Sequence, residues 1–339
     1  MGVRSFVRLT DRGIYCVPGR FYVDPWKAVD LAVISHGHGD HAKWGMGKYL
    51  CHAFTKPILK LRIGEGIDVQ TVEYGEEIDI NGVKVSLHPA GHIVGSAQIR
   101  MEYKGYVIVF SGDYKTDDDG LSTPFELVRC HEFITESTFG LPIYNWLKPH
   151  EYSELMQSWV QQNRDHGKTS VFIGYSLGKA QRIMKSIEGS GQLFVHSSIG
   201  KLNEGMESVG IVLPEYETLN FQEGVKHTDG EIVIVPPALF DSAMLKKIPN
   251  SATAFCSGWM QVRGSRRWRS ADAGFAVSDH ADWNGLIDTV KATGAEKVYV
   301  THGQTAVLSK YLNEIGIHAV ELKTIYEDND LTDNELKED

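Results

Sequence analysis

The stretch ISHGHGDHAKWG, residues 34–45, follows a short apolar run and places four metal-ligating side chains within six positions. These side chains are His36, His38, Asp40 and His41. Imidazole is the commonest protein ligand for transition metals, and carboxylate is a frequent second ligand. On an extended segment, histidines two positions apart project from one face and can bind one ion. Asp40 and His41 follow a turn and can reach a second ion, so the stretch predicts a metal site.

The length and composition indicate a globular protein with a large core. The chain has 339 residues, of which 42% are hydrophobic, and this predicts two domains or one domain with a sizeable insertion. We expect a cytoplasmic protein with no membrane partner, because no window reaches the roughly 18 apolar residues of a membrane span. The four cysteines lack CxxC spacing and are expected to be free thiols.

The charge of the chain is distributed unevenly. A net charge of −10 disfavours a polyanionic partner, but acidic residues gather in EDNDLTDNELKED, residues 327–339, which is predicted to be a disordered tail. The stretch QVRGSRRWRS, residues 261–270, has the opposite bias. Guanidinium groups around an aromatic ring suit a phosphate backbone and an unpaired base, although a solvated arginine loop is an equal alternative. The candidate substrate-binding residues here are Arg263, Arg266, Arg267, Trp268 and Arg269.

Five short strand-like runs each end at a polar side chain. AVDLAVIS precedes His36, VKVSLHPA precedes His92, GYVIVFSGD ends at Asp113, HEFITES contains Glu136 and KVYVTHG contains His302. Enzymes of the α/β class build their sites from such strand ends at one edge of a sheet. Asp113 is the natural carboxylate to bridge two ions, and His302 can complete the ligands of the second. Each ion would then have several nitrogen and oxygen ligands and an open position.

Residues 150–270 have a separate pattern. A charged helical stretch, a strand–turn–helix and two further strand-like pieces restart the periodicity, which predicts an inserted α/β domain with its own small sheet. Ser176, Lys179 and Arg182 lie around the start of its second helix, where backbone N–H groups and the helix dipole favour a phosphate. Ordinary capping and surface charge explain these residues equally well.

Several separated motifs together resemble one known family, the metallo-β-lactamase fold nucleases with a β-CASP insertion. SHGHGDH (35–41) is similar to the family's HxHxDH motif, and PAGHIVGS (89–96) and SGD (111–113) are similar to its next two metal motifs. ESTFG (136–140), GYSLGKAQRIM (174–184), SDHADW (278–283) and VTHG (300–303) resemble the additional marks of the β-CASP group. The resemblance covers nearly the whole chain, with the motifs in the family's order.

This resemblance implies a catalytic site with two divalent metal ions, zinc most readily and manganese as an alternative. One ion would be held by His36, His38, His92 and Asp113, and the other by Asp40, His41, Asp113 and His302. A hydroxide between the ions would attack phosphorus. Asp40 is counted as a catalytic residue in addition to being a metal ligand. Glu136 would orient His280, and His280 would protonate the departing sugar oxygen. The products would carry a 3′-hydroxyl and a 5′-phosphate.

The resemblance also implies a fold and a subgroup. We expect an αββα four-layer metallo-β-lactamase sandwich from residues 1–140 and 272–326, a β-CASP insertion at 141–271 and the tail at 327–339. The DPW before the metal motif and the SGWM segment before SDHADW are most similar to bacterial ligase-associated DNA exonucleases. The expected function is therefore a DNA exonuclease in repair, acting on single-stranded DNA, with a DNA ligase or helicase as a candidate partner.

Three alternatives remain open from the sequence. A ribonuclease of RNA processing or decay, similar to RNase J or the cleavage factors, would use the same phosphodiester chemistry on RNA. A small-molecule metallo-hydrolase shares HxHxDH but lacks the insertion with Glu136 and His280. A noncatalytic scaffold of the family would lack metal ligands, whereas this chain has every expected one.

Overall fold

The structure, a computed structural model, describes residues 5–219, 230–240, 242–248, 250–263 and 271–324. These residues form two compact units. Those of the first unit fall within Met1–Asp118, Ser122–Asn145 and His280–Leu331, and those of the second within Asp119–Leu121 and Trp146–Asp279. The predicted domain limits at 140/141 and 271/272 stay a prediction, and the acidic tail lies outside the described residues.

The first sheet of the first unit contains six strands in chain order. They are β1 (Val7–Thr10), β2 (Gly13–Cys16), β3 (Phe21–Val23), β4 (Leu31–Val33), β5 (Lys48–His52) and β6 (Val69–Val72). The first three pair antiparallel, and β3 to β6 pair parallel. The carboxyl ends of β3 to β6 therefore lie at one edge of the sheet, and the HxHxDH stretch leaves from the end of β4.

The second sheet of this unit has seven strands in the order β19-β18-β11-β10-β9-β8-β7. Their bounds are β7 (Glu77–Ile80), β8 (Val83–Pro89), β9 (Ala97–Tyr103), β10 (Tyr106–Phe110), β11 (Glu132–Ser137), β18 (Lys297–Gly303) and β19 (Ala319–Glu321). Strands β7 to β10 pair antiparallel, and β10, β11, β18 and β19 pair parallel. In β8, Val83, Val85 and Leu87 are buried while Lys84 is exposed, the period-2 pattern of a strand with an inner face.

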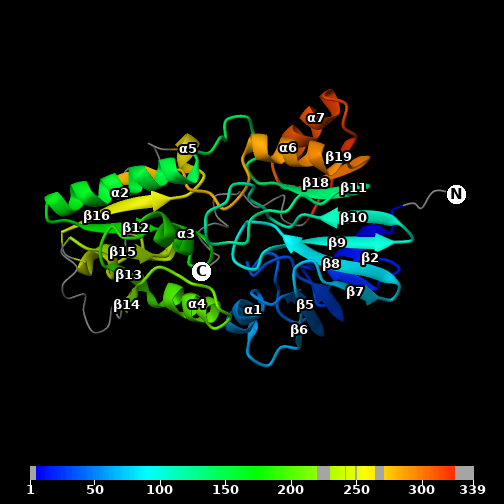
Figure 1. The fold of residues 1–339 in the computed structure, drawn as a ribbon, viewed down its shortest axis with the longest axis horizontal. Coiled ribbons are helices and arrows are strands. Elements are labelled where there is room, and N and C mark those ends of the chain that lie inside the picture. The colour runs from blue at the N-terminus through cyan, green and yellow to red at the C-terminus, as the bar shows by residue number, and fades with distance from the viewer. Residues whose placement is uncertain (1–4, 220–229, 241, 249, 264–270, 325–339) are drawn as a thin grey trace. The chain divides into compact units, whose positions relative to one another are not determined.

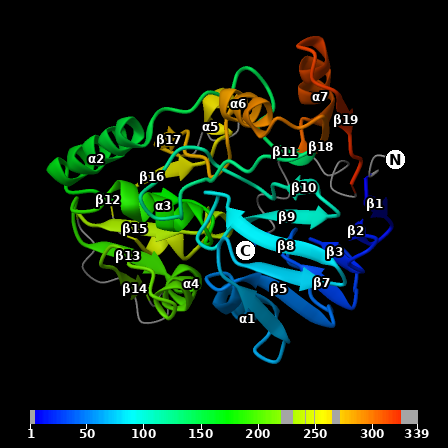
Figure 2. The same ribbon diagram turned by 45° about the vertical axis from the view of Figure 1, so that its right-hand side comes forward.

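Three helices accompany these sheets. They are α1 (Lys56–Ile63), α6 (Trp283–Thr293) and α7 (Thr305–Glu314). Side chains from both sheets, such as Val33, Leu50, Val85 and Phe110, form a common core. Leu59 of α1 packs with residues of β4 and β5, beside which α1 lies in both ribbon views (Figures 1 and 2). Helices α6 and α7 pack on the other face of the second sheet, beside β18 and β11.

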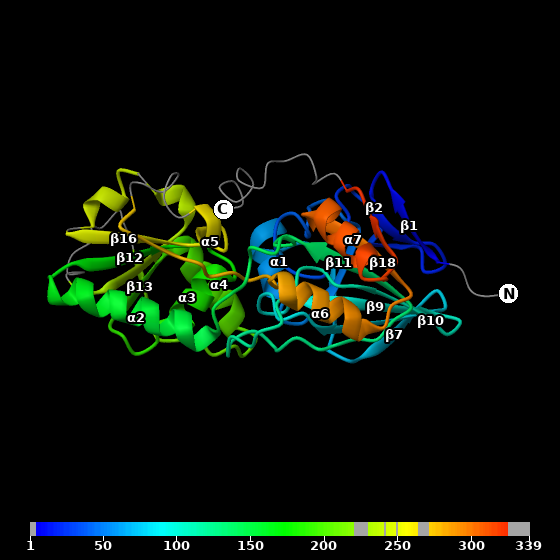
Figure 3. The ribbon, with the colours of Figure 1, turned by 90° about the horizontal axis from the view of Figure 1, so that it is seen from above.

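The second unit is built around one parallel sheet of six strands in the order β14-β13-β15-β12-β16-β17. The strands are β12 (Thr169–Ile173), β13 (Leu193–His196), β14 (Glu217–Leu219), β15 (Ile232–Val235), β16 (Ser251–Cys256) and β17 (Ala273–Phe275). The helices are α2 (Pro149–Asp165), α3 (Lys179–Ser186), α4 (Ser197–Glu207), α5 (Met260–Arg263) and the 3₁₀ turns η1 (Pro237–Leu239) and η2 (Leu245–Lys247). Helices α2 to α4 pack on one face, and η2 and α5 pack on the other (Figure 3).

The strand and helix predictions are confirmed where the structure describes the chain. The five site-bearing runs form β4, β8, β10, β11 and β18, and the charged stretch after residue 149 forms α2. The α/β class is therefore right. All four cysteines are buried and unpaired, as expected. Within the described ranges, no helix has the length and apolar character needed to cross a bilayer.

A buried histidine links the stability of the first unit to pH. The ring of His52, at the end of β5, stacks on Tyr74 with centroids 3.6 Å apart, and its Nδ1 accepts a hydrogen bond from the N–H of Phe54 (3.2 Å). Burial lowers the pKa of His52 to about 4. In the unfolded chain this imidazole binds a proton near pH 6.5, so the unfolded state takes up the proton first as the pH falls.

We therefore expect the contribution of His52 to stability to be complete above about pH 6.5 and to be lost as the pH falls toward 4. His52→Asn keeps an acceptor near the position of Nδ1 but cannot titrate. Urea unfolding of both proteins from pH 7.5 to 4 should give midpoints that fall more steeply for the wild type. Parallel curves would contradict this assignment, because all other titrating groups are common to both proteins.

Candidate metal centre

The topology of the first unit brings the ends of five strands to one place. β10, β11 and β18 are neighbours that run parallel, so Asp113, Glu136 and His302 come to the same edge of the second sheet. Gly112 allows the close approach of the two sheets there. Its φ is +56°, and a Cβ at this position would lie 2.7 Å from the Cβ of Ser35, the residue before His36.

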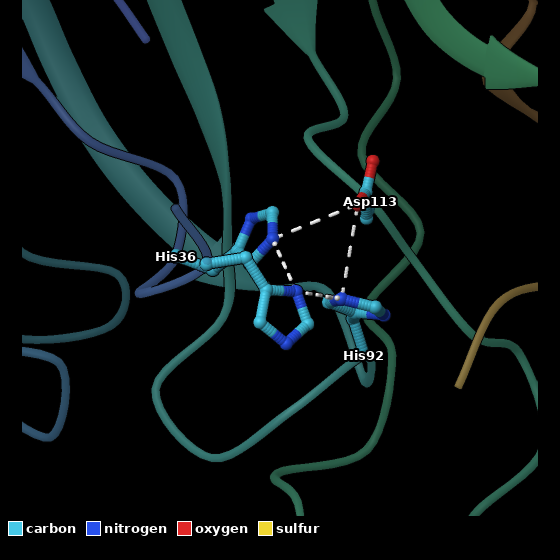
Figure 4. Close-up of side chains that lie close together, drawn as sticks. His36, His92 and Asp113 are labelled. Carbon is cyan, nitrogen blue, oxygen red and sulfur yellow. Dashed lines mark hydrogen bonds and ion pairs between the residues drawn. The ribbon is translucent and has the colours of Figure 1, made fainter. Parts of the chain in front are cut away.

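One group of candidate ligands consists of His36, His38, His92 and Asp113, whose ligand atoms all lie within 4.8 Å of one another. Nδ1 of His38 is 3.1 Å from Nε2 of His36 and 3.1 Å from Nε2 of His92. Oδ2 of Asp113 is 3.6 Å from Nε2 of His36 and 3.8 Å from Nε2 of His92. Figure 4 shows His36, His92 and Asp113 pointing toward one another. The structure thus gathers the four residues that the sequence assigns to one ion.

A second group contains Asp40, His41 and His302, again within 4.8 Å of one another. Nε2 of His41 lies 3.5 Å from Oδ2 of Asp40, and the rings of His41 and His302 stack with centroids 5.1 Å apart. His302 has φ +53°, a left-handed conformation that is uncommon for a residue with a side chain and is typical of functional sites. These are the remaining predicted ligands.

Asp113 lies between the two groups. Its Oδ2 is 3.4 Å from Nε2 of His41, so one oxygen is close to atoms of both groups. Among the described residues, Nε2 of His41 and Oδ1 of Asp113 are buried atoms without a hydrogen-bond partner. Buried polar atoms are nearly always satisfied, so these two fit a site whose natural occupant is a cation. The residues therefore form a buried cluster that could hold metal, as expected.

The charges of this cluster perturb its pKa values. Burial and the neighbouring imidazoles of His41, His92 and His38 keep the pKa of His36 well below its ordinary value. Burial also acts on His41, but the carboxylates of Asp113 and Asp40 outweigh it and raise the pKa of His41 well above the ordinary value. The pKa of Asp113 is well below its usual range, because His41 and other imidazoles outweigh the effect of burial. Asp113 is therefore ready to bind a cation.

Glu136 and His280 form a pair beside this cluster. Nδ1 of His280 is 2.9 Å from each carboxylate oxygen of Glu136. Glu136 is buried and also accepts hydrogen bonds from the N–H of Tyr114 (2.8 Å) and of Thr138 (3.3 Å), so its orientation is fixed. The rings of His92 and His280 lie 4.6 Å apart, and Asp113, Glu136 and His280 form a compact group of their own.

The sequence analysis missed Asp24. This buried carboxylate at the end of β3 lies 2.7 Å from Nδ1 of His41 and accepts hydrogen bonds from the N–H of Ser35 (2.8 Å) and from its hydroxyl. Asp24 thus holds the ring nitrogen of His41 that faces away from Asp113, and it fixes the tautomer and tilt of that ring. Its φ of +40° is unusual for aspartate, and its signal in the sequence is the DPW motif, residues 24–26, which the resemblance used for the subgroup and not for metal binding.

The predicted substrate-binding residues have mixed outcomes. The side chain of Arg263 and residues Arg266, Arg267, Trp268 and Arg269 lie outside what the structure describes. Ser176 is buried, with its hydroxyl 2.9 Å from that of Ser198. Lys179 is also buried, and its Nζ lies 2.8 Å from Oδ2 of Asp279. A role of these residues in substrate binding stays a prediction.

Arg182 belongs to a buried ionic network within the second unit. Its guanidinium lies 2.8 Å from Asp119 and 2.9 Å from Asp279, and all three side chains are at most 5% exposed. Together with Lys179 the network contains two cations and two carboxylates. Such groups are stable in the interior only when each charge is compensated. The network explains Arg182 as a structural residue.

Several known proteins are similar to this chain. A "Probable DNA ligase" of Opitutus terrae is 29% identical over 94% of this chain, and "Cleavage and polyadenylation specificity factor 73" of Drosophila melanogaster is 28% identical over 48%. "Endoribonuclease YSH1" of Saccharomyces cerevisiae is 30% identical over 34% of this chain. These similarities agree with the resemblance of the sequence motifs to the β-CASP group of metallo-β-lactamase fold proteins. No family model matches the sequence.

The chain spans only part of the length of these relatives. The chain spans 31% of the Opitutus protein, 29% of the Drosophila protein and 15% of the yeast protein, less than a third of each. A solved structure titled as a protein of unknown function from Enterococcus faecalis aligns with a TM-score of 0.60 at 13% identity. It covers 87% of this chain and 79% of its own, and at that identity it supports the fold alone.

Asp24→Asn should weaken metal binding about 10- to 100-fold, because the amide cannot hold the Nδ1–H of His41 as a carboxylate does. Competition with a chromophoric chelator would measure the affinity. Asp11→Asn is the matched control, since Asp11 is an exposed carboxylate that pairs with Lys27 at 3.3 Å. Equal affinities of the Asp24 variant and the wild type would show that this contact does not tune the metal centre.

Arg182→Met should lower the free energy of unfolding by about 3–5 kcal/mol, because it leaves the buried carboxylates of Asp119 and Asp279 without their guanidinium. Lys185→Met removes a surface cation from the same helix and should change stability by less than about 1 kcal/mol. Urea unfolding followed by circular dichroism distinguishes the two. A small effect at Arg182 would mean that Lys179 alone can compensate both carboxylates.

Proposed function

We propose that this chain is a metal-dependent phosphodiesterase, and specifically a DNA exonuclease of repair. The observation that carries the proposal is the combination of two ligand groups sharing Asp113 with an oriented Glu136–His280 pair beside them. A general-acid pair next to a candidate two-metal centre suits phosphodiester hydrolysis, in which charge develops on the phosphoryl oxygens and on the departing sugar oxygen.

Two divalent ions, most readily zinc, would occupy the two groups. His36, His38, His92 and Asp113 would hold one, and Asp40, His41, His302 and again Asp113 would hold the other. When bound, such a pair of ions supplies an activated water and neutralises the charge of the phosphoryl group. The neutral imidazole favoured by the low pKa of His36 and the ionised carboxylate of Asp113 are the forms that a metal requires.

His280 would supply the proton for the leaving group. Its Nδ1 faces both oxygens of Glu136, so Nε2 is the ring nitrogen that can hand a proton to the substrate. The carboxylate keeps the ring in one orientation and stabilises its charged form. With a side chain 18% exposed, His280 can meet a bound substrate, whereas the buried Glu136 at 1% acts through it.

DNA is the favoured substrate because the match that spans most of this chain carries the name of a DNA ligase. A nuclease attached to or acting with a ligase would trim strand ends before joining, which makes a ligase the favoured partner and a helicase a second candidate. The relatives named as a cleavage and polyadenylation factor and an endoribonuclease support a ribonuclease as the second candidate function. The chemistry of the site is the same whether the substrate is DNA or RNA.

The proposed architecture is the αββα sandwich with a β-CASP insertion. The order α1, first sheet, second sheet, then α6 and α7, with a shared core between the sheets, supports four layers in the first unit. The self-contained parallel sheet of the second unit supports an insertion at about 141–271. Candidates for contacts with the nucleic-acid substrate are Ser176, Lys179, Arg263, Arg266, Arg267, Trp268 and Arg269.

A cleavage assay on 5′-phosphorylated single-stranded DNA and on RNA of the same sequence tests the function. With Zn²⁺ or Mn²⁺ and a label at either end, stepwise shortening of DNA is expected, and the position of the label gives the polarity. Asp40→Ala should abolish cleavage. Cleavage of RNA alone would select the ribonuclease, and internal cuts would replace the exonuclease assignment by an endonuclease.

His280→Ala should lower kcat about 10²- to 10⁴-fold through loss of the general acid. The metal content should stay that of the wild type, because His280 is not among the residues proposed to hold the two ions. His318→Ala, which alters an exposed histidine of the same unit, is the control and should leave kcat unchanged. Loss of metal from the His280 variant, measured by atomic emission, would overturn the general-acid assignment.

A further inference from the structure

Trp44 is an aromatic residue whose side chain lies at the surface. Its side chain is 80% exposed, and among the described residues no other Phe, Tyr or Trp is classed as exposed. Most aromatic side chains bury 150–250 Å² and contribute to cores or interfaces. An indole that is exposed to water is therefore a candidate for contact with a binding partner.

The loop that carries Trp44 is tightly anchored. Ala42 and Met46, on either side of Trp44, are buried in the core that β4, β5 and α1 share. The hydroxyl of the buried Tyr49 donates to the carbonyl of Lys43 (2.8 Å) and accepts from the N–H of Met46 (3.3 Å). The backbone on both sides of Trp44 is thus held by one side chain.

Two glycines complete this loop. Gly45 has φ +90°, and a Cβ at Gly47 would lie 2.8 Å from the carbonyl oxygen of Asp30. The N–H of Gly47 donates to the carbonyl of Val29 (2.9 Å). The exposure of Trp44 therefore follows from a defined backbone path, so little backbone freedom is left to lose when the indole binds.

The loop lies next to the candidate metal centre. Trp44 comes three residues after His41, so their Cα atoms are at most about 11 Å apart. Residues 41–50 contain Lys43 and Lys48 and no acidic residue, in a chain whose net charge is −10. An exposed ring with a lysine on either side in the sequence, three residues from a candidate ligand of a site that suits phosphodiesters, matches the stacking surfaces of proteins that hold single strands.

We propose that Trp44 is a stacking platform for a nucleobase of the substrate strand, close to the nucleotide whose phosphodiester is cleaved. The proposal rests on the proposed nuclease function and adds a contact outside the metal centre. Every base has a flat face, so the platform would hold the strand without reading its sequence, and it would serve an unpaired strand better than a duplex.

A pair of matched probes tests this contact. One is a phosphorothioate oligothymidylate of 12 nucleotides, and the other is an abasic phosphorothioate strand of the same length, which keeps the charges but has no bases. Binding to metal-loaded protein is followed by fluorescence anisotropy. Trp44→Ala should weaken binding of the oligothymidylate about tenfold and leave the affinity for the abasic strand unchanged. Trp44→Phe should retain most of the affinity, and Val212→Ala, which alters a side chain 88% exposed, should change neither probe.

The other outcomes each reject the platform. Equal affinity of the wild type and Trp44→Ala for oligothymidylate, while the wild type still cleaves DNA, leaves the nuclease function standing and removes the platform. Equal weakening for both strands, or loss of metal, would mean that Trp44 supports the loop. A changed oligomeric state in gel filtration with unchanged DNA affinity would assign the indole to a protein contact. If the wild type neither binds nor cleaves DNA or RNA, the proposed function fails as well.

Discussion

The candidate metal centre depends on the carboxylate of Asp113, which lies 3.4 to 3.8 Å from the Nε2 atoms of His41, His36 and His92. Buried imidazoles at such distances disfavour each other's charge, and only a shared anion or a metal makes their proximity acceptable. Gly112 permits this arrangement because a side chain there would collide with Ser35. Asp24 and Glu136 are two further carboxylates that each pair with an imidazole. Asp24 contacts Nδ1 of His41, and Glu136 contacts Nδ1 of His280.

The sequence predicts which side chains gather here, because the two signals, apolar runs and the donor residues at their ends, are local. Apolar runs mark β4, β8, β10, β11 and β18, and the donor residues follow directly after each run or lie at its end. Asp24 gives no comparable signal, since its contact with His41 depends on a φ of +40° and on the parallel pairing of β3 with β4. In the sequence, Arg182 has the pattern of a surface cation. In the structure its guanidinium contacts Asp279, which is 97 residues away in the chain.

The two units use buried charge in different ways. In the second unit, the charges of two cations and two carboxylates balance one another in the network of Arg182, Lys179, Asp119 and Asp279. In the first unit, atoms of His41 and Asp113 are left buried without a hydrogen-bond partner. Compensated burial indicates a structural role, whereas uncompensated burial indicates a site that binds something further.

Glu136 and His280 are 144 residues apart, yet their pairing needs only contacts within the first unit. Strand β11 pairs parallel with β18, and the N–H of Gln304 donates to the carbonyl of Ser137 (2.8 Å), so the chain is held at the residue after Glu136. On the other side, the N–H of Ala281 donates to the carbonyl of Tyr114, beside Asp113. The chain is thus anchored at both ends of the intervening segment. A segment between two anchored points can diverge in length and sequence while the Glu136–His280 pair that flanks it keeps its geometry.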